Sequence, residues 1–129
     1  MTKIEMEKVI LDKMNEIVEE HNEHDNHQRE WVNKEIANGT DKDFFKDLFY
    51  FNGYIYTSEL KDVISTVMFG HPAEEHIEYD RRFRGVPRGR NYRNVLTDEE
   101  RVTVNKIAHG MINANIIKLS KSGAMVKVL

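Results

Sequence analysis

Apolar residues in the first part of the chain recur at steps of three and four, the spacing that places side chains on one face of a helix. Within residues 3–20 they are Met6, Ile10, Met14, Ile17 and Val18. The pattern predicts an amphipathic helix, which begins a helical arm over residues 1–38.

The polar stretch at residues 22–26 leaves two interpretations of this arm open. In one, the helix continues to Ile36 with a seam that is polar in its middle, an arrangement that favours self-association. In the other, the helix breaks at residues 22–26, because Asn, Asp and His are weak helix formers. Asn38-Gly39 ends the helix in both cases.

Residues 40–57 are rich in aromatic side chains. Thr40 can cap a short helix. Asn52-Gly53 lies between two runs of aromatic and β-branched residues, which is typical of a hairpin because both residues tolerate positive φ. The sequence favours a hairpin over residues 48–57, and the alternative is a helix closed by Asn52-Gly53. Trp31 and this aromatic run are expected in the core.

Two further helices follow the aromatic run. We expect Ser58 to cap the first, which Gly70 stops. Thr97 and Glu100 have the spacing of a capping box, so a second helix is expected from there to Gly123.

The remaining patterns concern the end of the chain and one glycine. Gly110 lies within the last helix, where a missing side chain would let a neighbouring helix pack closely. The tail, residues 124–129, alternates apolar and polar positions and is expected to be an edge strand added to the hairpin.

Together the patterns predict a mainly α protein. We expect a single compact helical domain over residues 1–129, with at most a small antiparallel sheet built from residues 48–57 and 124–129. Residues 71–96 show no sustained period and are expected to be an irregular, Arg-rich loop.

Composition narrows the class of protein. A chain of 129 residues can bury a core without a stabilising cofactor, so none is expected. The absence of cysteine removes disulfides and thiolate metal sites and favours a cytoplasmic location. No apolar run approaches the length that spans a membrane, and the first residues lack the pattern of a secretory signal.

Charge is distributed very unevenly. Residues 1–80 contain 8 Lys/Arg and 19 Asp/Glu, a balance of −11, whereas residues 81–129 contain 11 and 3, a balance of +8; together they give the net charge of −3. Residues 81–93 contain no acid. Such a segment needs anions from a ligand, from another protein or from this chain.

The arginine segment, residues 81–93, is the leading candidate site. Guanidinium groups bind phosphates, often in a bidentate manner, and aromatic rings stack on bases. The site residues are Arg81, Arg82, Phe83, Arg84, Arg88, Arg90, Tyr92 and Arg93. The leading hypothesis is a small non-enzymatic binding protein that engages nucleic acid or a nucleotide.

Other partners would satisfy the same arginines. They could pair with acids just upstream in this chain, at Glu74, Glu75, Glu78 and Asp80, or dock onto an acidic protein. A second hypothesis is a protein–protein inhibitor or adaptor of bacterial or phage type, acting through its acidic half or its aromatic hairpin. Homo-oligomers are expected in either case, and no pair of carboxylates stands out as a catalytic site.

A histidine cluster gives a third and weaker hypothesis. His21, His24 and His27 are spaced at threes, so on a helix His21 and His24 could share a metal ion with Asp25 close by. The adjacent His24-Asp25 resembles the metal-binding pair of HD-type phosphohydrolases, which are all-helical. This resemblance covers two residues and implies a metal-dependent phosphohydrolase.

Overall fold

Three α-helices make up most of the part of the chain that the structure, a computed structural model, describes: residues 1–76 and 92–129. In chain order the elements are α1 (Lys3–Ala37), the 3-10 helix η1 (Lys42–Phe45), β1 (Tyr54–Tyr56), α2 (Thr57–Phe69), β2 (Glu74–His76), β3 (Tyr92–Asn94), α3 (Asp98–Asn113), β4 (Ile117–Leu119) and β5 (Met125–Val128). The predicted fold class, mainly α with a small antiparallel sheet, is confirmed.

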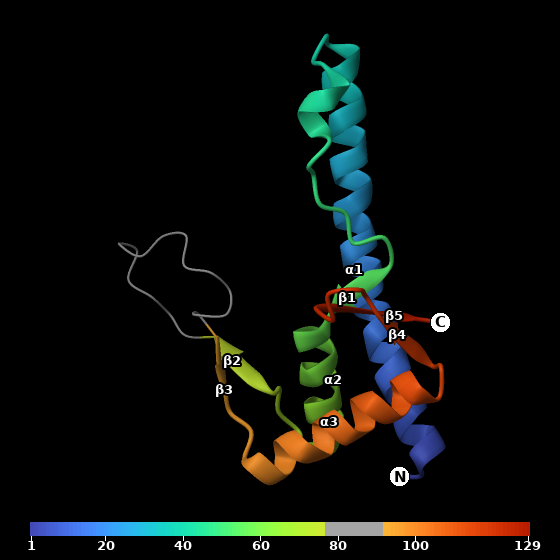
Figure 1. Ribbon diagram of the computed structural model, residues 1–129, viewed down its shortest axis with the longest axis vertical. Coiled ribbons are helices and arrows are strands. Elements are labelled where there is room, and N and C mark those ends of the chain that lie inside the picture. The colour runs from blue at the N-terminus through green and yellow to red at the C-terminus, as the bar shows by residue number, and fades with distance from the viewer. Residues whose placement is uncertain (77–91) are drawn as a thin grey trace.

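Helix α1 is continuous, so the polar stretch at residues 22–26 does not break it. The first half of α1 packs against α2 and the sheet, and α2 packs against α3; we call this unit the body. The second half of α1 extends beyond the body, and from here on we call that half the arm (Figure 1). The helix begins with Thr2, which accepts the N–H of Glu5 at 3.2 Å. It ends as expected at Asn38-Gly39, where Gly39 has a φ of +100°.

Residues 38–53 run back along the arm to β1, and we call them the return segment (Figure 1). Asp41, and not Thr40, caps the short helix η1 by accepting the N–H of Asp43 at 3.0 Å. The Asn52-Gly53 turn is present, with φ values of +52° and +87°.

The predicted hairpin over residues 48–57 is wrong, because residues 48–51 form no strand. The N–H groups of Phe51 and Asn52 donate instead to the side chain of Asp25 on α1. Strand β1 is therefore left to pair elsewhere, and it pairs with β5.

The sheet has the order β1-β5-β4 and is antiparallel throughout. The predicted tail strand is confirmed, but it is the central strand rather than an edge. Sequence reasoning missed β4, since the last helix ends at Asn113 and not at Gly123. Asn115, with a φ of +59°, turns the chain into β4.

The caps of the two later helices were predicted with different success. Helix α2 begins two residues before the position expected from Ser58: its N-cap is Tyr56, whose N–H donates to Glu59 at 2.9 Å. The capping box of α3 is confirmed, with Thr97 N–H to Glu100 at 2.9 Å and Glu100 N–H to the Thr97 hydroxyl at 3.1 Å.

The body encloses an aliphatic core to which all three helices and the sheet contribute. Its buried members are Ile10, Met14, Ile55, Leu60, Val63, Ile64, Ala73, Leu96, Val104, Ala108, Met111, Ile117 and Val126. The expectation of an aromatic core is wrong for Trp31, Phe44 and Phe49, which are 47%, 74% and 48% exposed. The return segment carries Phe44, Phe45 and Phe49 along the arm, outside the body, whereas Tyr54 and Tyr56 lie in β1.

Gly110 does not serve close packing. A Cβ built there would meet no atom within 4 Å among the described residues, so the expected neighbouring helix is not there.

Candidate functional site

The arginine segment is reached through a two-stranded antiparallel ribbon made of β2 and β3. The register pairs Glu74 with Asn94, Glu75 with Arg93 and His76 with Tyr92. Residues 71–96 were expected to be irregular throughout, and these two strands correct that expectation at both ends. The ribbon places His76 and Tyr92 side by side (Figure 1).

Most of the predicted ligand-binding residues fall outside the described part of the chain. They are Arg81, Arg82, Phe83, Arg84, Arg88 and Arg90. Only Tyr92 and Arg93 of the predicted set can be placed, and both lie on β3.

Arg93 forms an ion pair with Glu75, its cross-strand neighbour. The two side chains are 66% and 45% exposed, so water screens the pair and its contribution to stability is small. One of the arginines is therefore paired with an upstream acid of the same chain, as the alternative interpretation of the sequence expected.

The ribbon is anchored to the body by α2. Asp62 accepts the N–H groups of Ala73 and Glu74 at 3.0 and 3.1 Å. The buried hydroxyl of Ser65 donates to the carbonyl of His71 at 2.6 Å, at the start of the same connection. Polar groups of α2 thus fix the position at which β2 leaves the body.

A second contact anchors this region to α3. His71 Nε2 lies 3.6 Å from the Glu100 carboxylate. The N–H of Thr97 holds the pKa of the Glu100 carboxyl below its ordinary value, and the nearby His71 acts in the same direction. Glu100 therefore serves both in the capping box of α3 and in the contact to His71, near the start of the ribbon.

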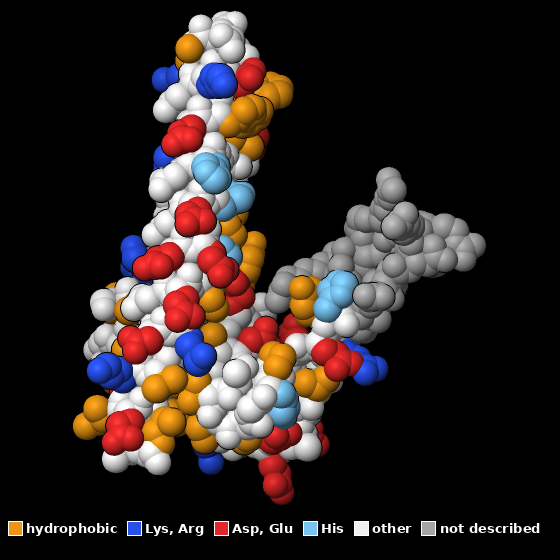
Figure 2. Space-filling model, turned by 180° about the vertical axis from the view of Figure 1, so that it is seen from behind, with side chains coloured by type: hydrophobic (Ala, Val, Ile, Leu, Met, Phe, Trp, Pro, Cys, Tyr) orange, Lys and Arg blue, Asp and Glu red, His pale blue; other side chains and the backbone are white. Residues whose placement is uncertain are grey.

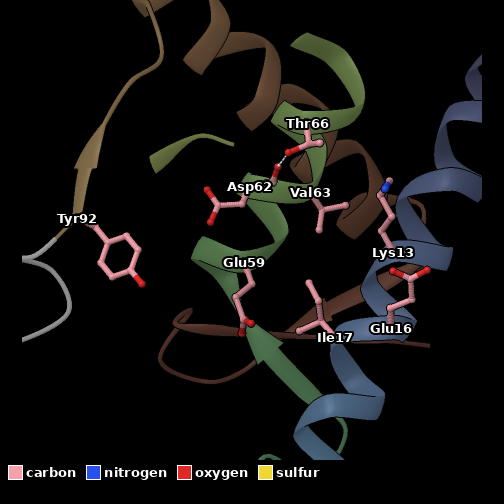
Figure 3. A pocket seen from close by; sticks show the side chains of 8 residues that line it. All are labelled: Lys13, Glu16, Ile17, Glu59, Asp62, Val63, Thr66 and Tyr92. Atoms are coloured by element: carbon pink, nitrogen blue, oxygen red, sulfur yellow. Dashed lines mark hydrogen bonds between the residues drawn. The ribbon is translucent and has the colours of Figure 1, made fainter. Parts of the chain in front are cut away.

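A pocket of about 410 Å³ lies between α1, α2 and β3 (Figure 3). Its lining consists of Lys13, Glu16, Ile17, Glu59, Asp62, Val63, Thr66 and Tyr92. Figure 3 shows the Tyr92 ring directed from the ribbon toward α2, across from the α1 side chains. The lining contains three carboxylates and one lysine, so the pocket favours cationic groups and not phosphate.

The carboxylates of this pocket also hold the fold together. Glu59 accepts from His21 Nε2 at 2.8 Å and joins α1 to α2. His21 in turn stacks on Phe51, with ring centroids 3.8 Å apart and an angle of 2° between the planes. Glu59 and Asp62 are therefore structural groups as well as pocket lining.

The predicted metal ligands His21, His24 and Asp25 have other partners. Both oxygens of Asp25 accept backbone N–H groups, from Phe51 and Asn52, each at 2.9 Å. His24 Nδ1 is 3.6 Å from Asp25. Within residues 1–76 and 92–129, no three His, Asp or Glu side chains are placed to hold a metal ion.

Asp25 is ionised in spite of its burial. Burial alone would raise the pKa of its carboxyl, but the N–H groups of Asn52 and Phe51, together with His24 and Arg29, hold that pKa below its ordinary value. Sequence reasoning considered Asp25 as a metal ligand and missed its role as the acceptor that fixes the return segment. No local signal marked this role, since α1 contains nine other acids and the acceptor is set by contact with a distant segment.

Comparison with protein-family models, with curated proteins and with solved structures gave no match. No helix in the described residues is long and apolar enough to cross a membrane.

Proposed function

We propose that this protein binds a phosphate-bearing ligand, nucleic acid or a nucleotide, through the arginine segment 81–93. Single-sign clusters of arginine bind phosphates in bidentate, charge-assisted contacts that carry no sequence preference of their own. The balance of +8 over residues 81–129 supports attraction of a polyanion to this part of the chain.

The observation that carries the proposal is the register of the ribbon. Because His76 lies opposite Tyr92, the two described residues that border the segment lie side by side, on a ribbon that is anchored to the body through Asp62. Strand ribbons are one of the elements by which proteins present side chains to nucleic-acid grooves and backbones.

The roles of the individual residues follow from their chemistry. In this proposal Arg81, Arg82, Arg84, Arg88 and Arg90 neutralise phosphates. The stacking role falls to Phe83, because Tyr92 lines the pocket between α1 and α2. Arg93 joins the ligand only when it leaves Glu75.

The test is an anisotropy titration of labelled single- and double-stranded oligonucleotides across a salt series. For duplex DNA, the slope of log affinity against log salt is about −0.9 per phosphate contact, so Arg88→Ala/Arg90→Ala is expected to reduce the slope by about 2 and to weaken binding of all sequences alike. Arg101→Ala is the matched control, because Arg101 is an exposed arginine on α3 outside the segment.

Two results would overturn the proposal. One is the absence of binding at low salt by oligonucleotides and by free nucleotides. The other is binding that Arg88→Ala/Arg90→Ala leaves unchanged.

An inhibitor or adaptor of another protein is the second candidate function. The acids along α1 form a row on the face seen in Figure 2, which supports contact with a basic protein. The metal-dependent phosphohydrolase is not proposed, because Asp25 already binds two N–H groups. A cytoplasmic location stays a prediction.

A further inference from the structure

The outer end of the arm carries a patch of aromatic side chains, and we call Trp31, Phe44 and Phe45 the tip patch. Phe45 is buried and touches both Trp31 and Phe44 edge-on, with ring centroids 5.2 Å apart in each pair. Trp31 is 47% exposed and Phe44 is 74% exposed. Figure 2 shows hydrophobic side chains gathered near this end of the arm.

The tip patch is large enough to form the centre of a protein interface. Taking about 200 Å² for a whole aromatic side chain, its two exposed members leave roughly 240 Å² of apolar surface in water. A standard interface buries about 800 Å² on each partner, of which somewhat over half is apolar, or about 450 Å². The tip patch therefore supplies about half of the apolar area that one side of a standard interface needs.

The charge around the tip patch indicates which partner fits it. Residues 27–47 contain 4 Lys/Arg and 5 Asp/Glu, a balance of −1, whereas residues 3–25 contain 3 and 8, a balance of −5. A strongly basic partner would be drawn to the inner part of α1 and not to its tip. A surface of nearly balanced charge does not repel a second copy of itself, whereas two copies of the inner part of α1 would repel each other.

We propose that the tip patch is the contact surface of a homodimer in which the arms of two copies pack together about a twofold axis. Such an axis brings the same patch of both copies into contact, so each copy gives and receives the same side chains. The arm extends away from the body, which leaves the two bodies clear of each other (Figure 1). The proposal uses none of residues 77–93 and is independent of phosphate binding.

Trp31 makes the proposal directly testable, because it is the only tryptophan of the chain. Its fluorescence reports burial at the tip patch, while sedimentation equilibrium of the same samples reports mass. From micromolar to millimolar protein, we expect the mass to rise to that of a dimer and the Trp31 emission to shift to shorter wavelength in the same range.

The variant Phe44→Ser tests whether the tip patch, and not another surface, forms the dimer contact. Phe44 is 74% exposed, so the variant keeps its fold, which circular dichroism verifies. We expect its dimer dissociation constant to rise by about tenfold or more, as for loss of an aromatic anchor. Ile4→Ser is the matched control, because Ile4 is 79% exposed at the far end of α1, and it should leave dimerisation unchanged.

Three outcomes would overturn the proposal: a monomer at every concentration, a dimer that Phe44→Ser leaves intact, or a dimer that forms without any change in Trp31 emission. None of these measurements depends on oligonucleotide binding. Failure of the proposed dimer and failure of the proposed phosphate ligand are therefore distinguishable.

Discussion

Asp25 and Asn52 are 27 positions apart in the chain and are joined by a hydrogen bond of 2.9 Å from the Asn52 N–H to Asp25 Oδ2. The other oxygen of the same carboxylate accepts the Phe51 N–H at 2.9 Å. One buried side chain thus ends the return segment and starts the turn into β1.

Replacement of Asp25 by alanine is expected to lower the free energy of unfolding by about 2–4 kcal/mol, since two charge-assisted hydrogen bonds are lost and two N–H groups are left without their acceptor. Urea denaturation followed by circular dichroism measures the loss, and hydrogen exchange at Phe51 and Asn52 locates it. Glu23→Ala, an exposed acid on the same helix, should change stability by less than about 0.5 kcal/mol. Equal effects of the two variants would contradict a special role for Asp25.

Stability should also depend on pH through Asp25. The folded state holds the pKa of its carboxyl below the ordinary value of 3.8, so the stabilisation is present above about pH 3.8 and is lost as the pH falls through the folded pKa. Asp25→Asn cannot titrate at this position. The difference in unfolding free energy between the wild type and Asp25→Asn should therefore shrink below about pH 3.8. A difference that grows there would contradict a lowered pKa of Asp25 in the folded state.

Gly110→Ala should stabilise the protein by about 0.5–1 kcal/mol, because glycine within a helix has an entropic cost and the new Cβ meets no atom within 4 Å. Gly70 offers a matched comparison, since a Cβ there also meets no atom within 4 Å but its φ is +81°. Gly70→Ala should destabilise by about 1 kcal/mol. Thermal denaturation of both variants measures the two effects, and a loss of stability in Gly110→Ala would indicate a packing partner for Gly110.

Glu75→Gln should strengthen oligonucleotide binding. The change releases Arg93 from its exposed ion pair, a pair worth at most about 1 kcal/mol, so the gain is expected to reach up to about fivefold. Glu74→Gln removes the same charge from the same strand without touching that pair, and its effect should be smaller. Anisotropy titrations at low salt compare the two, and weaker binding by Glu75→Gln would contradict competition between Glu75 and the ligand.

Helix positions could be predicted from the sequence where local signals agreed. The apolar spacing at Ile10 and Met14 and the capping box at Thr97 and Glu100 depend on neighbours within one or two turns, and both predictions are confirmed. The Asn52-Gly53 turn was likewise predicted, because its positive φ values are a property of the two residues themselves.

The partners of that turn could not be predicted. Asp25 accepts the Phe51 N–H that a hairpin ladder would have used, and that competition is visible only when residues 26 positions apart meet. Strand β4 was missed for a similar reason, since Ile117 becomes a strand residue only through its pairing with Val128. The pocket and the ribbon also depend on contacts between segments that are distant in the chain. Five of the six arginines of the predicted site lie outside the described residues.

The central place of β5 in the sheet has a consequence for the order of folding. Strand β1 contacts no strand other than β5 in the described sheet, and Ile55 must find Val126, 71 positions along the chain. Closure of a long loop is slow, whereas the contacts that fold the arm join residues fewer than 30 positions apart. We therefore expect the arm and its return segment to fold early, and the body to close last, when β5 enters between β1 and β4.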